Sequence, residues 1–215
     1  MESAIRDQAP KDLRVFETMR WTPEEGVHNR VLHLARLARS CEKLGIAPVA
    51  LEGLLDHFVS NEAERLRLSI GLGGDIKLES WPFTPLPEGT IWKVAIAQQQ
   101  LRSDDPWLGI KTTRRELYNA ARAGLPEGID ELVFLNERDE VCEGTITNVF
   151  VLQDDVLATP PLSSGLLPGV LRQSLLDQGK AKEVLLGVSD LQAADELLVG
   201  NSLRGLIRAE LVNAV

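Results

Sequence analysis

The chain has 215 residues, with 23 Lys and Arg against 32 Asp and Glu, so its formal net charge is −9. This acidic balance argues against nucleic acid and anionic membranes as partners. Two cysteines are too few for a disulfide framework, and no apolar run reaches the ~18 residues of a membrane helix. Since the polar start MESAIRDQAPKD also lacks a secretory h-region, we expect a cytoplasmic globular protein, and no metal site is predicted.

The first part of the chain is expected to form a small lobe of strands and helices. Alternating faces in VFETMRW, residues 15–21, predict a strand. Apolar side chains at helical spacing predict a helix over residues 28–44, which Gly45 would end. The remaining expected elements are a helix from Pro48 to about Ser60, a hairpin over 65–81 that turns at Gly73-Gly74, and a strand over 91–97.

A polar segment broken by Pro106 is expected to connect this lobe to a larger one. The predicted boundaries are 1–98 for the small lobe, 99–109 for the connector and 110–215 for the larger lobe. In the latter we expect helices over 112–123 and 169–178, and short strands over 131–136, 141–145, 148–153, 156–160, 182–189, 196–201 and 205–212. The mixture predicts an α+β fold with a ligand site in the cleft between the lobes.

Two residues stand out for possible chemistry. Lys111 precedes a predicted helix, where the field of the helix N-terminus disfavours an ammonium group and suits a nucleophilic amine; by itself it could equally be a surface lysine. Glu143 lies in VCEGTITNVF, a carboxylate among small and apolar residues. Such an acid is uncommon without a partner, although a glutamate at a strand end is the simpler interpretation.

Two segments could hold a phosphate. In GLLPGVLRQ, Pro168 and Gly169 precede a helix, so the N–H groups of Val170 and Leu171 could bind an anion. GNSLRG supplies Asn201 and Ser202 at a strand end. Each segment could equally be an ordinary cap or turn, and GLGG over 71–74 is more typical of a hairpin turn.

One predicted helix carries two further candidates. Arg36 could be a solvated side chain or a phosphate clamp, whereas His33, on the same side of that helix, is more typical of a structural or surface histidine.

The order of these segments resembles one family along nearly the whole chain. FETMRW, HLARL, a lysine before a helix, CEGTITNVF, TPPLSSGLLPGVLR and ADELLVGNS follow one another as in the class IV, fold type IV enzymes that use pyridoxal 5′-phosphate (PLP). This resemblance implies that Lys111 is the Schiff-base lysine and that Glu143 contacts the pyridine nitrogen. It also implies that Arg36, Val170, Leu171, Asn201 and Ser202 bind the cofactor phosphate. A homodimer acting on a small amino substrate is likewise implied.

Within the family, the sequences of these segments most resemble those of the aminodeoxychorismate lyases of folate precursor synthesis. Branched-chain aminotransferases usually place a tyrosine five residues after the lysine, and this chain has Glu116 there and Tyr118 two residues later. We therefore expect a lyase that forms 4-aminobenzoate and pyruvate. An aminotransferase acting on a small amino acid and a 2-oxo acid, and a shortened non-catalytic relative, are the alternatives.

Overall fold

The structure, a computed structural model, describes residues 5–47, 51, 53–153 and 155–212. The chain forms two compact units, Met1–Pro85 with Ile110–Arg114, and Leu86–Gly109 with Arg115–Val215. The division thus falls at Pro85, and not at residue 98 as expected, because the strand at 91–97 pairs inside the second unit. The expected connector 99–109 also belongs to the second unit.

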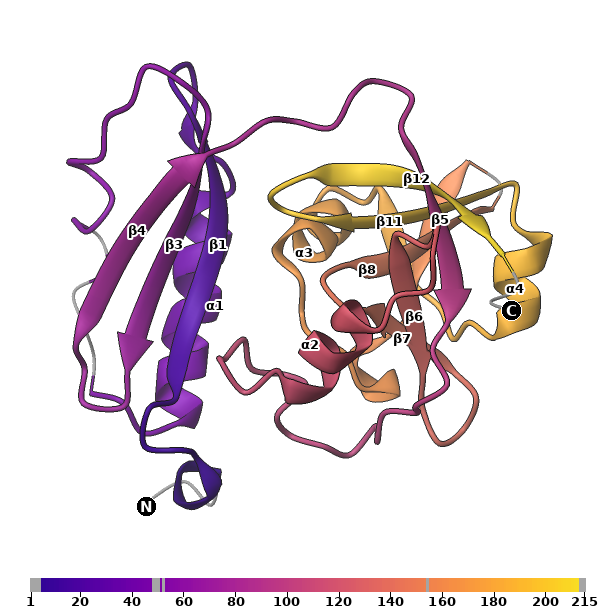
Figure 1. Ribbon diagram of the computed structural model, residues 1–215, viewed down its shortest axis with the longest axis horizontal. Coiled ribbons are helices and arrows are strands. Elements are labelled where there is room, and N and C mark those ends of the chain that lie inside the picture. Colours follow the sequence, from indigo (N-terminus) through magenta and orange to yellow (C-terminus); the bar gives the residue numbers. More distant parts are fainter. Residues whose placement is uncertain (1–4, 48–50, 52, 154, 213–215) are drawn as a thin grey trace. The chain divides into compact units, whose positions relative to one another are not determined.

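The first unit is an antiparallel sheet covered on one face by a helix (Figure 1). Its strand order is β2-β1-β3-β4, and α1 packs on β1. The bounds are β1 Arg14–Thr22, β2 Gly26–Val27, β3 Glu64–Gly71, β4 Ile76–Pro82 and α1 Arg30–Lys43, preceded by the short helix η1 Arg6–Gln8. The strand, helix and hairpin predictions are confirmed here, and Gly45 and Gly74 take the positive φ that ends the helix and turns the hairpin.

The prediction of a helix from Pro48 to Ser60 is wrong for the described residues of that range, none of which is helical. Residues 48–50 and 52 lie outside the described residues. From Gly53 to His57 the chain forms turns closed by bonds between residues three apart, such as Asp56 N–H to the Gly53 carbonyl at 3.3 Å. Apolar spacing alone does not distinguish such successive turns, with Leu55 buried beneath them, from an α-helix.

The second unit is built on a closed β-barrel. Its strands follow the cyclic order β8-β11-β12-β5-β6-β7, and pairing of β7 with β8 closes the ring. Strands β9 and β10 extend the sheet beyond β8, and α3 packs on β10 and β11 (Figure 1). The bounds are β5 Ile91–Ile96, β6 Glu131–Leu135, β7 Val141–Gly144, β8 Asn148–Gln153, β9 Val156–Thr159, β10 Ala181–Glu183, β11 Glu196–Asn201, β12 Gly205–Leu211, η2 Leu162–Ser164 and α3 Val170–Asp177.

The barrel confirms the α+β class and the β-barrel-like second lobe. A core of Trp92, Val94, Val133, Val149, Val199 and Ile207 comes from strands far apart in the sequence. Packing these side chains together removes their apolar surface from water and stabilises the closed sheet. None of the helices among the described residues is long and apolar enough to cross a membrane.

Two elements of the second unit differ from expectation. The helix expected from Thr112 is α2, Glu116–Ala123, and begins four residues later. The strand expected over 182–189 is only β10, and the chain then turns into the short helix α4, Val188–Ala193. Asp190 accepts a hydrogen bond from the Gly187 N–H at 2.7 Å, which starts this helix where a strand was predicted.

Candidate functional site

Lys111 lies beside β1 in the first unit. The Phe16 N–H donates to the Lys111 carbonyl at 3.0 Å, Val15 forms an isolated bridge with Thr112, and the Thr113 N–H donates to the Arg14 carbonyl at 2.9 Å. Residues 111–113 are thereby held in extended form, which is why α2 begins only at Glu116. The expected place of Lys111 at a helix N-terminus is therefore wrong. Its amine lies instead 4.9 Å from the centre of the Phe16 ring.

The sheet face that carries Phe16 is rich in cations. The Arg67 guanidinium lies 4.0 Å from the same ring, so Arg67 and Lys111 share one aromatic neighbour. Four residues beyond Phe16 on the same face of β1, Arg20 is directly opposite Arg65 on β3. Like charges in register across a sheet repel each other, and a bound anion would relieve that repulsion. This basic face is therefore suited to a carboxylate-bearing ligand.

Arg36 lies on the opposite face of this sheet, in a buried cluster with Glu17 and His33. Its Nε and Nη2 donate to the two carboxylate oxygens of Glu17 at 2.8 and 2.5 Å, and His33 Nδ1 is 2.6 Å from Oε2. Burial alone would raise the pKa of Glu17, but Arg36 and His33 lower it to about 2. The interpretation of Arg36 as a solvated arginine is wrong, and His33 is structural. The predicted phosphate contact of Arg36 stays a prediction.

Burial also determines the charge state of His33. Desolvation lowers the pKa of His33, and the nearby cations Arg36 and Lys111 lower it further, against the opposing effect of Glu17. The cluster therefore consists of one carboxylate, one guanidinium and an imidazole that resists protonation. Such an arrangement fixes the orientation of the Arg36 side chain.

Glu143 is in the second unit, on β7, and only 6% of its surface is exposed. Its carboxylate accepts hydrogen bonds from the Tyr118 hydroxyl at 2.6 Å and from the Leu167 N–H at 3.1 Å. Burial, followed by the charge of Glu143, raises the pKa of Tyr118, so the phenol keeps its proton and remains a donor. These two contacts hold the Glu143 carboxylate in a fixed orientation inside the protein.

The predicted phosphate segments come together near Glu143. Asn201, at the end of β11, donates from Nδ2 to the Ile146 carbonyl at 3.1 Å, and its Oδ1 accepts the N–H groups of Leu203 and Arg204. Asn148 donates to the Leu167 carbonyl at 3.1 Å. These bonds place the β7–β8 turn, the β11–β12 turn and the segment that leads into α3 at one end of the barrel. Ser202 lies in the β11–β12 turn.

Two glycines are required for this approach. A Cβ on Gly169, the N-cap of α3, would lie 1.7 Å from Asn148 Oδ1. A Cβ on Gly200 would lie 2.8 Å from Leu171 Cδ2. Gly169 has no side chain that could cap α3, and an N-terminus of this kind presents its first N–H groups to an anion. The phosphate contact of Val170 and Leu171 stays a prediction.

Three residues of this region were not predicted as part of the site. Tyr118 orients Glu143, Asn148 ties β8 to Leu167, and Glu131, at the start of β6, binds the β7–β8 turn. A tyrosine on a short amphipathic helix and an acid at a strand start look like surface residues in a sequence. The sequence signal for Glu131 is its position at the start of an apolar strand. In the structure its side chain is fully buried.

Each unit, taken by itself, has groups that fit one part of PLP. The cofactor has a phosphate dianion, for which an uncapped helix N-terminus is suited, and a ring nitrogen whose protonated form needs an anionic acceptor. Glu143 is a buried carboxylate whose orientation is set by two donors, which is the chemistry that such an acceptor requires. Lys111 supplies an amine beside a basic face.

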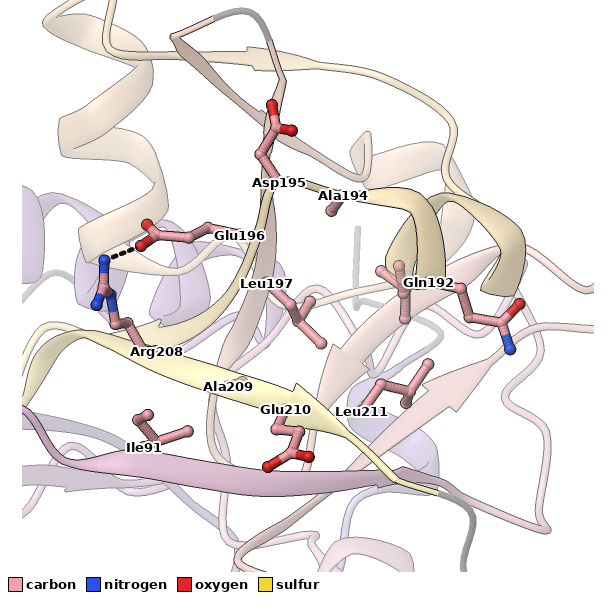
Figure 2. Close-up of a pocket in the computed structure, with 11 residues that line it drawn as sticks. Ile91, Gln192, Ala194, Asp195, Glu196, Leu197, Arg208, Ala209, Glu210 and Leu211 are labelled. Carbon is pink, nitrogen blue, oxygen red and sulfur yellow. Dashed lines mark hydrogen bonds and ion pairs between the residues drawn. The ribbon is translucent and has the colours of Figure 1, made fainter.

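A separate pocket of about 530 Å³ opens at the start of β11, whereas Asn201 is at the end of that strand. Figure 2 shows Glu196 turned toward Arg208, with which it forms an ion pair, and Asp195 pointing away from both. Apolar side chains that include Leu191 complete the lining. The pocket shares no lining residue with the candidate site.

Comparison with known proteins identifies relatives along the chain. The family model for amino-transferase class IV matches residues 14–212. The aminodeoxychorismate lyase of Saccharomyces cerevisiae is 26% identical over 189 residues, which cover 67% of this chain and only 50% of the yeast protein. A protein of Thermotoga maritima, named provisionally as a branched-chain-amino-acid aminotransferase, is 29% identical over 109 residues, 48% of this chain and 40% of that protein.

Solved structures agree with the family model. A crystal structure from Mesorhizobium loti, provisionally named an amino-acid aminotransferase, is 44% identical with a TM-score of 0.86, and the match covers 94% of this chain and 100% of that one. A hypothetical aminotransferase from Mycobacterium tuberculosis in its PLP-bound form shares the fold, with a TM-score of 0.78 at 21% identity over 92% of this chain and 81% of that one.

Proposed function

This chain belongs to the PLP-dependent class IV aminotransferase family, and we propose that within it the protein acts as a 4-amino-4-deoxychorismate lyase. The reaction splits one substrate into 4-aminobenzoate and pyruvate, and it consumes no second substrate. The observation that carries this choice is the basic face of the first unit, where Arg20, Arg65 and Arg67 accompany Lys111. The substrate has two carboxylates, so several cations near the reactive amine suit it.

We assign roles to the residues in the following way. The Lys111 amine would bond to the cofactor aldehyde and, once displaced by the substrate amine, would carry the proton from the substrate Cα. Glu143 would hold a proton at the ring nitrogen. The phosphate would be bound by Arg36, Val170, Leu171, Asn201 and Ser202. When bound, PLP supplies a pyridinium ring that stabilises negative charge at the substrate carbon.

The chain itself would contribute orientation and charge. Tyr118 and the Leu167 N–H keep the Glu143 carboxylate in one position, so that it does not rotate when the ring is present. Glu17 does the same for the Arg36 guanidinium. The basic face would orient the substrate by its carboxylates while the Lys111 amine moves the proton.

Transamination is the second candidate, and a specific observation favours it. The Mesorhizobium loti structure, at 44% identity, has an aminotransferase name. A single carboxylate on an amino acid or 2-oxo acid would also be attracted to the basic face. The two candidates use the same cofactor residues, and they differ in whether a 2-oxo acid is needed as amino acceptor.

The first experiment tests the cofactor and the lysine. Purified protein is mixed with PLP, its visible absorption spectrum is recorded, and the sample is reduced with borohydride and mapped by peptide mass. We expect the visible absorption band of a PLP imine. We also expect a label on Lys111 that is lost in Lys111→Ala and kept in the control Lys93→Ala. Absence of the band, or a label elsewhere, would show a non-catalytic relative or a different site.

The second experiment separates the two reactions. The loaded protein is given 4-amino-4-deoxychorismate without any 2-oxo acid, and 4-aminobenzoate is measured by its fluorescence. Product formation supports the lyase. Turnover of small amino acids only when a 2-oxo acid is added, with no 4-aminobenzoate, would replace it with an aminotransferase. Arg67→Met should raise KM for either substrate more than it lowers kcat, because Arg67 would bind and not react.

We also propose that the protein works in the cytoplasm, in folate precursor synthesis, and as a homodimer. The family resemblance supports the homodimer and the pathway, and the lack of an apolar run as long as a membrane helix supports the cytoplasmic location. Light scattering coupled to size exclusion measures the mass directly. A mass near 23.7 kDa at micromolar concentration would contradict the dimer.

A further inference from the structure

We propose that Glu131 is a positioning residue of the cofactor site: its buried carboxylate fixes the β7–β8 turn, residues 144–147, and thereby the place of Glu143 and of the Asn201 side chain. The inference rests on the proposed PLP site. No role for Glu131 follows from the cofactor chemistry, since Glu143 and Lys111 already supply the acid and the amine. Glu131 would act only through the turn that it binds.

The carboxylate is fully buried and is used from both oxygens. Oε1 accepts the N–H of Thr145 at 3.0 Å and also the Thr145 hydroxyl. Oε2 accepts the N–H of Ile146 at 3.2 Å and the hydroxyl of Thr147 at 3.0 Å. The Leu132 N–H, at 3.1 Å from Oε1, anchors the carboxylate to its own strand. Three consecutive residues of the turn are thus tied to one side chain on β6.

Glycine at position 144 is required by the same arrangement. A Cβ there would lie 2.3 Å from Thr147 Oγ1 and 2.9 Å from the Glu131 Cδ. The carboxylate therefore occupies the space directly beneath the turn, and the backbone closes over it through the Gly144 N–H, which donates to the Thr147 carbonyl at 2.7 Å.

The outer side of the turn is bonded to the site. The Ile146 carbonyl accepts Asn201 Nδ2 at 3.1 Å, and the Thr145 carbonyl accepts Arg115 Nη2 at 2.5 Å. Glu143 immediately precedes the turn and pairs with Asn148 immediately after it. A shift of the turn would therefore move both the carboxylate for the ring nitrogen and the partner of the β11–β12 turn.

A hairpin turn of this kind does not need an internal carboxylate to close. Burying a charged group costs free energy, and it is retained only where its partners are well placed. Glu131 is satisfied mainly by neutral N–H and O–H donors of one turn, with Arg122 Nη1 further away at 3.5 Å. The arrangement is that of a fixed anchor for a segment whose position matters to a ligand.

The test compares Glu131→Gln with the neighbouring control Asp130→Asn. Asp130 also accepts a backbone N–H, from Lys93 at 2.8 Å, but does not contact the turn. The glutamine amide would present donors to groups that already donate, so the turn should lose its anchor. PLP affinity is measured by Trp fluorescence at a temperature where circular dichroism shows every variant folded. We expect Kd for PLP to rise about tenfold or more in Glu131→Gln and to be unchanged in Asp130→Asn.

A pair of substitutions tests the same contact from the turn. Thr147→Ser keeps the hydroxyl and should bind PLP as the wild type does, whereas Thr147→Val removes it and should weaken binding. In the double variant with Glu131→Gln, the valine should add little further loss, since both changes remove one shared contact. Unaltered affinity in Glu131→Gln and Thr147→Val, with only a lower melting temperature, would reduce Glu131 to a purely structural residue.

A cofactor-free measurement separates this inference from the proposed function. Amide hydrogen exchange of the peptide over 141–150 is followed without PLP. Faster exchange at Thr145 and Ile146 in Glu131→Gln, but not in Asp130→Asn, is expected because their N–H groups donate to Glu131. Unchanged exchange would overturn the anchor even where the wild type binds PLP. Failure of the wild type to bind PLP, with exchange changed as expected, would overturn the proposed function alone.

Discussion

Each unit of the molecule contains a fully buried glutamate, and the two are satisfied in opposite ways. In the first unit, Glu17 is paired with the charged Arg36 and with His33. In the second, Glu131 accepts backbone and hydroxyl donors of a single turn, and the guanidinium of Arg122 is further away, at 3.5 Å. The first arrangement orients one cation, whereas the second fixes a stretch of backbone.

The difference predicts different sensitivities. A paired charge depends on its partner and on pH, because removing either charge leaves the other one buried and alone. A carboxylate among neutral donors depends on geometry, so an isosteric amide should be enough to disturb it.

The largest effect is expected for Arg36→Met. It leaves the Glu17 charge without its guanidinium partner, and the free energy of unfolding should fall by about 3–5 kcal/mol. In Glu17→Gln/Arg36→Met both charges are gone, and part of that loss should be recovered. Urea unfolding followed by Trp fluorescence measures both variants. A double variant that is less stable than Arg36→Met would contradict the ion-pair interpretation.

Acid should produce the next largest effect. Unfolded Glu17 takes up a proton near its ordinary pKa of 4.5, whereas folded Glu17, with a pKa of about 2, does so only at lower pH. Its contribution is therefore complete above about pH 4.5 and is lost as the pH falls toward 2. Urea titrations across this range should show a steeper loss of stability in the wild type than in Glu17→Gln. Parallel curves would show that other carboxylates account for the acid sensitivity.

A smaller effect is expected for Tyr118→Phe. Glu143 Oε1 loses the hydroxyl 2.6 Å away, and a hydrogen bond to a charged group contributes about 1.5–3 kcal/mol. PLP affinity should fall as well, because Glu143 becomes less well oriented. Leu117→Ala, on the exposed side of the same helix, is the control for helix stability. Equal losses in the two variants would mean that the hydroxyl has no particular role.

The smallest effect is expected for Asp75→Asn. Asp75 pairs with Arg14 on the surface of the first unit, where its side chain is 61% exposed. Water and salt screen such pairs, and the Asp75 carbonyl still accepts Arg14 Nη2 at 2.9 Å in the variant. Urea midpoints of the variant and the wild type should agree within error. A clear loss of stability would show that exposed charges matter here as much as the buried cluster.

Much of the fold could be predicted because local signals decide it. Alternation in β1, the apolar runs of β6 and β8, and glycines with positive φ at positions 45 and 74 all act within a few residues. The start of α2 was predicted too early because residues 111–113 pair with β1, which is nearly 100 residues away, at about 3 Å hydrogen-bond distances. Pairing between residues so far apart in the chain cannot be predicted from the local pattern of apolar and polar residues.

In the candidate site, too, the sequence indicates features that depend on nearby residues and does not indicate contacts between distant ones. The order of the motifs indicates Lys111, Glu143 and the start of α3, because these residues lie inside motifs that can be recognised in the sequence. Partners were not visible: Glu17 for Arg36 and Tyr118 for Glu143 are known only once the elements are packed. Glu131 follows Asp130, and two adjacent acids at a strand start look like a solvated turn, although one is exposed and the other is fully buried.

The closure of the barrel has a consequence for the order of folding. β7 and β8, the strand pair that completes the ring, pair at Glu143 and Asn148. The ring also requires β5 to pair with β12, where Ile91 is opposite Arg208. Contacts between residues so distant in the chain form slowly, because a long loop must be ordered first. Glu143 lies on β7, at the strand pair that closes the ring. Closure of the ring is therefore expected late in folding, after β5 and β12 have paired.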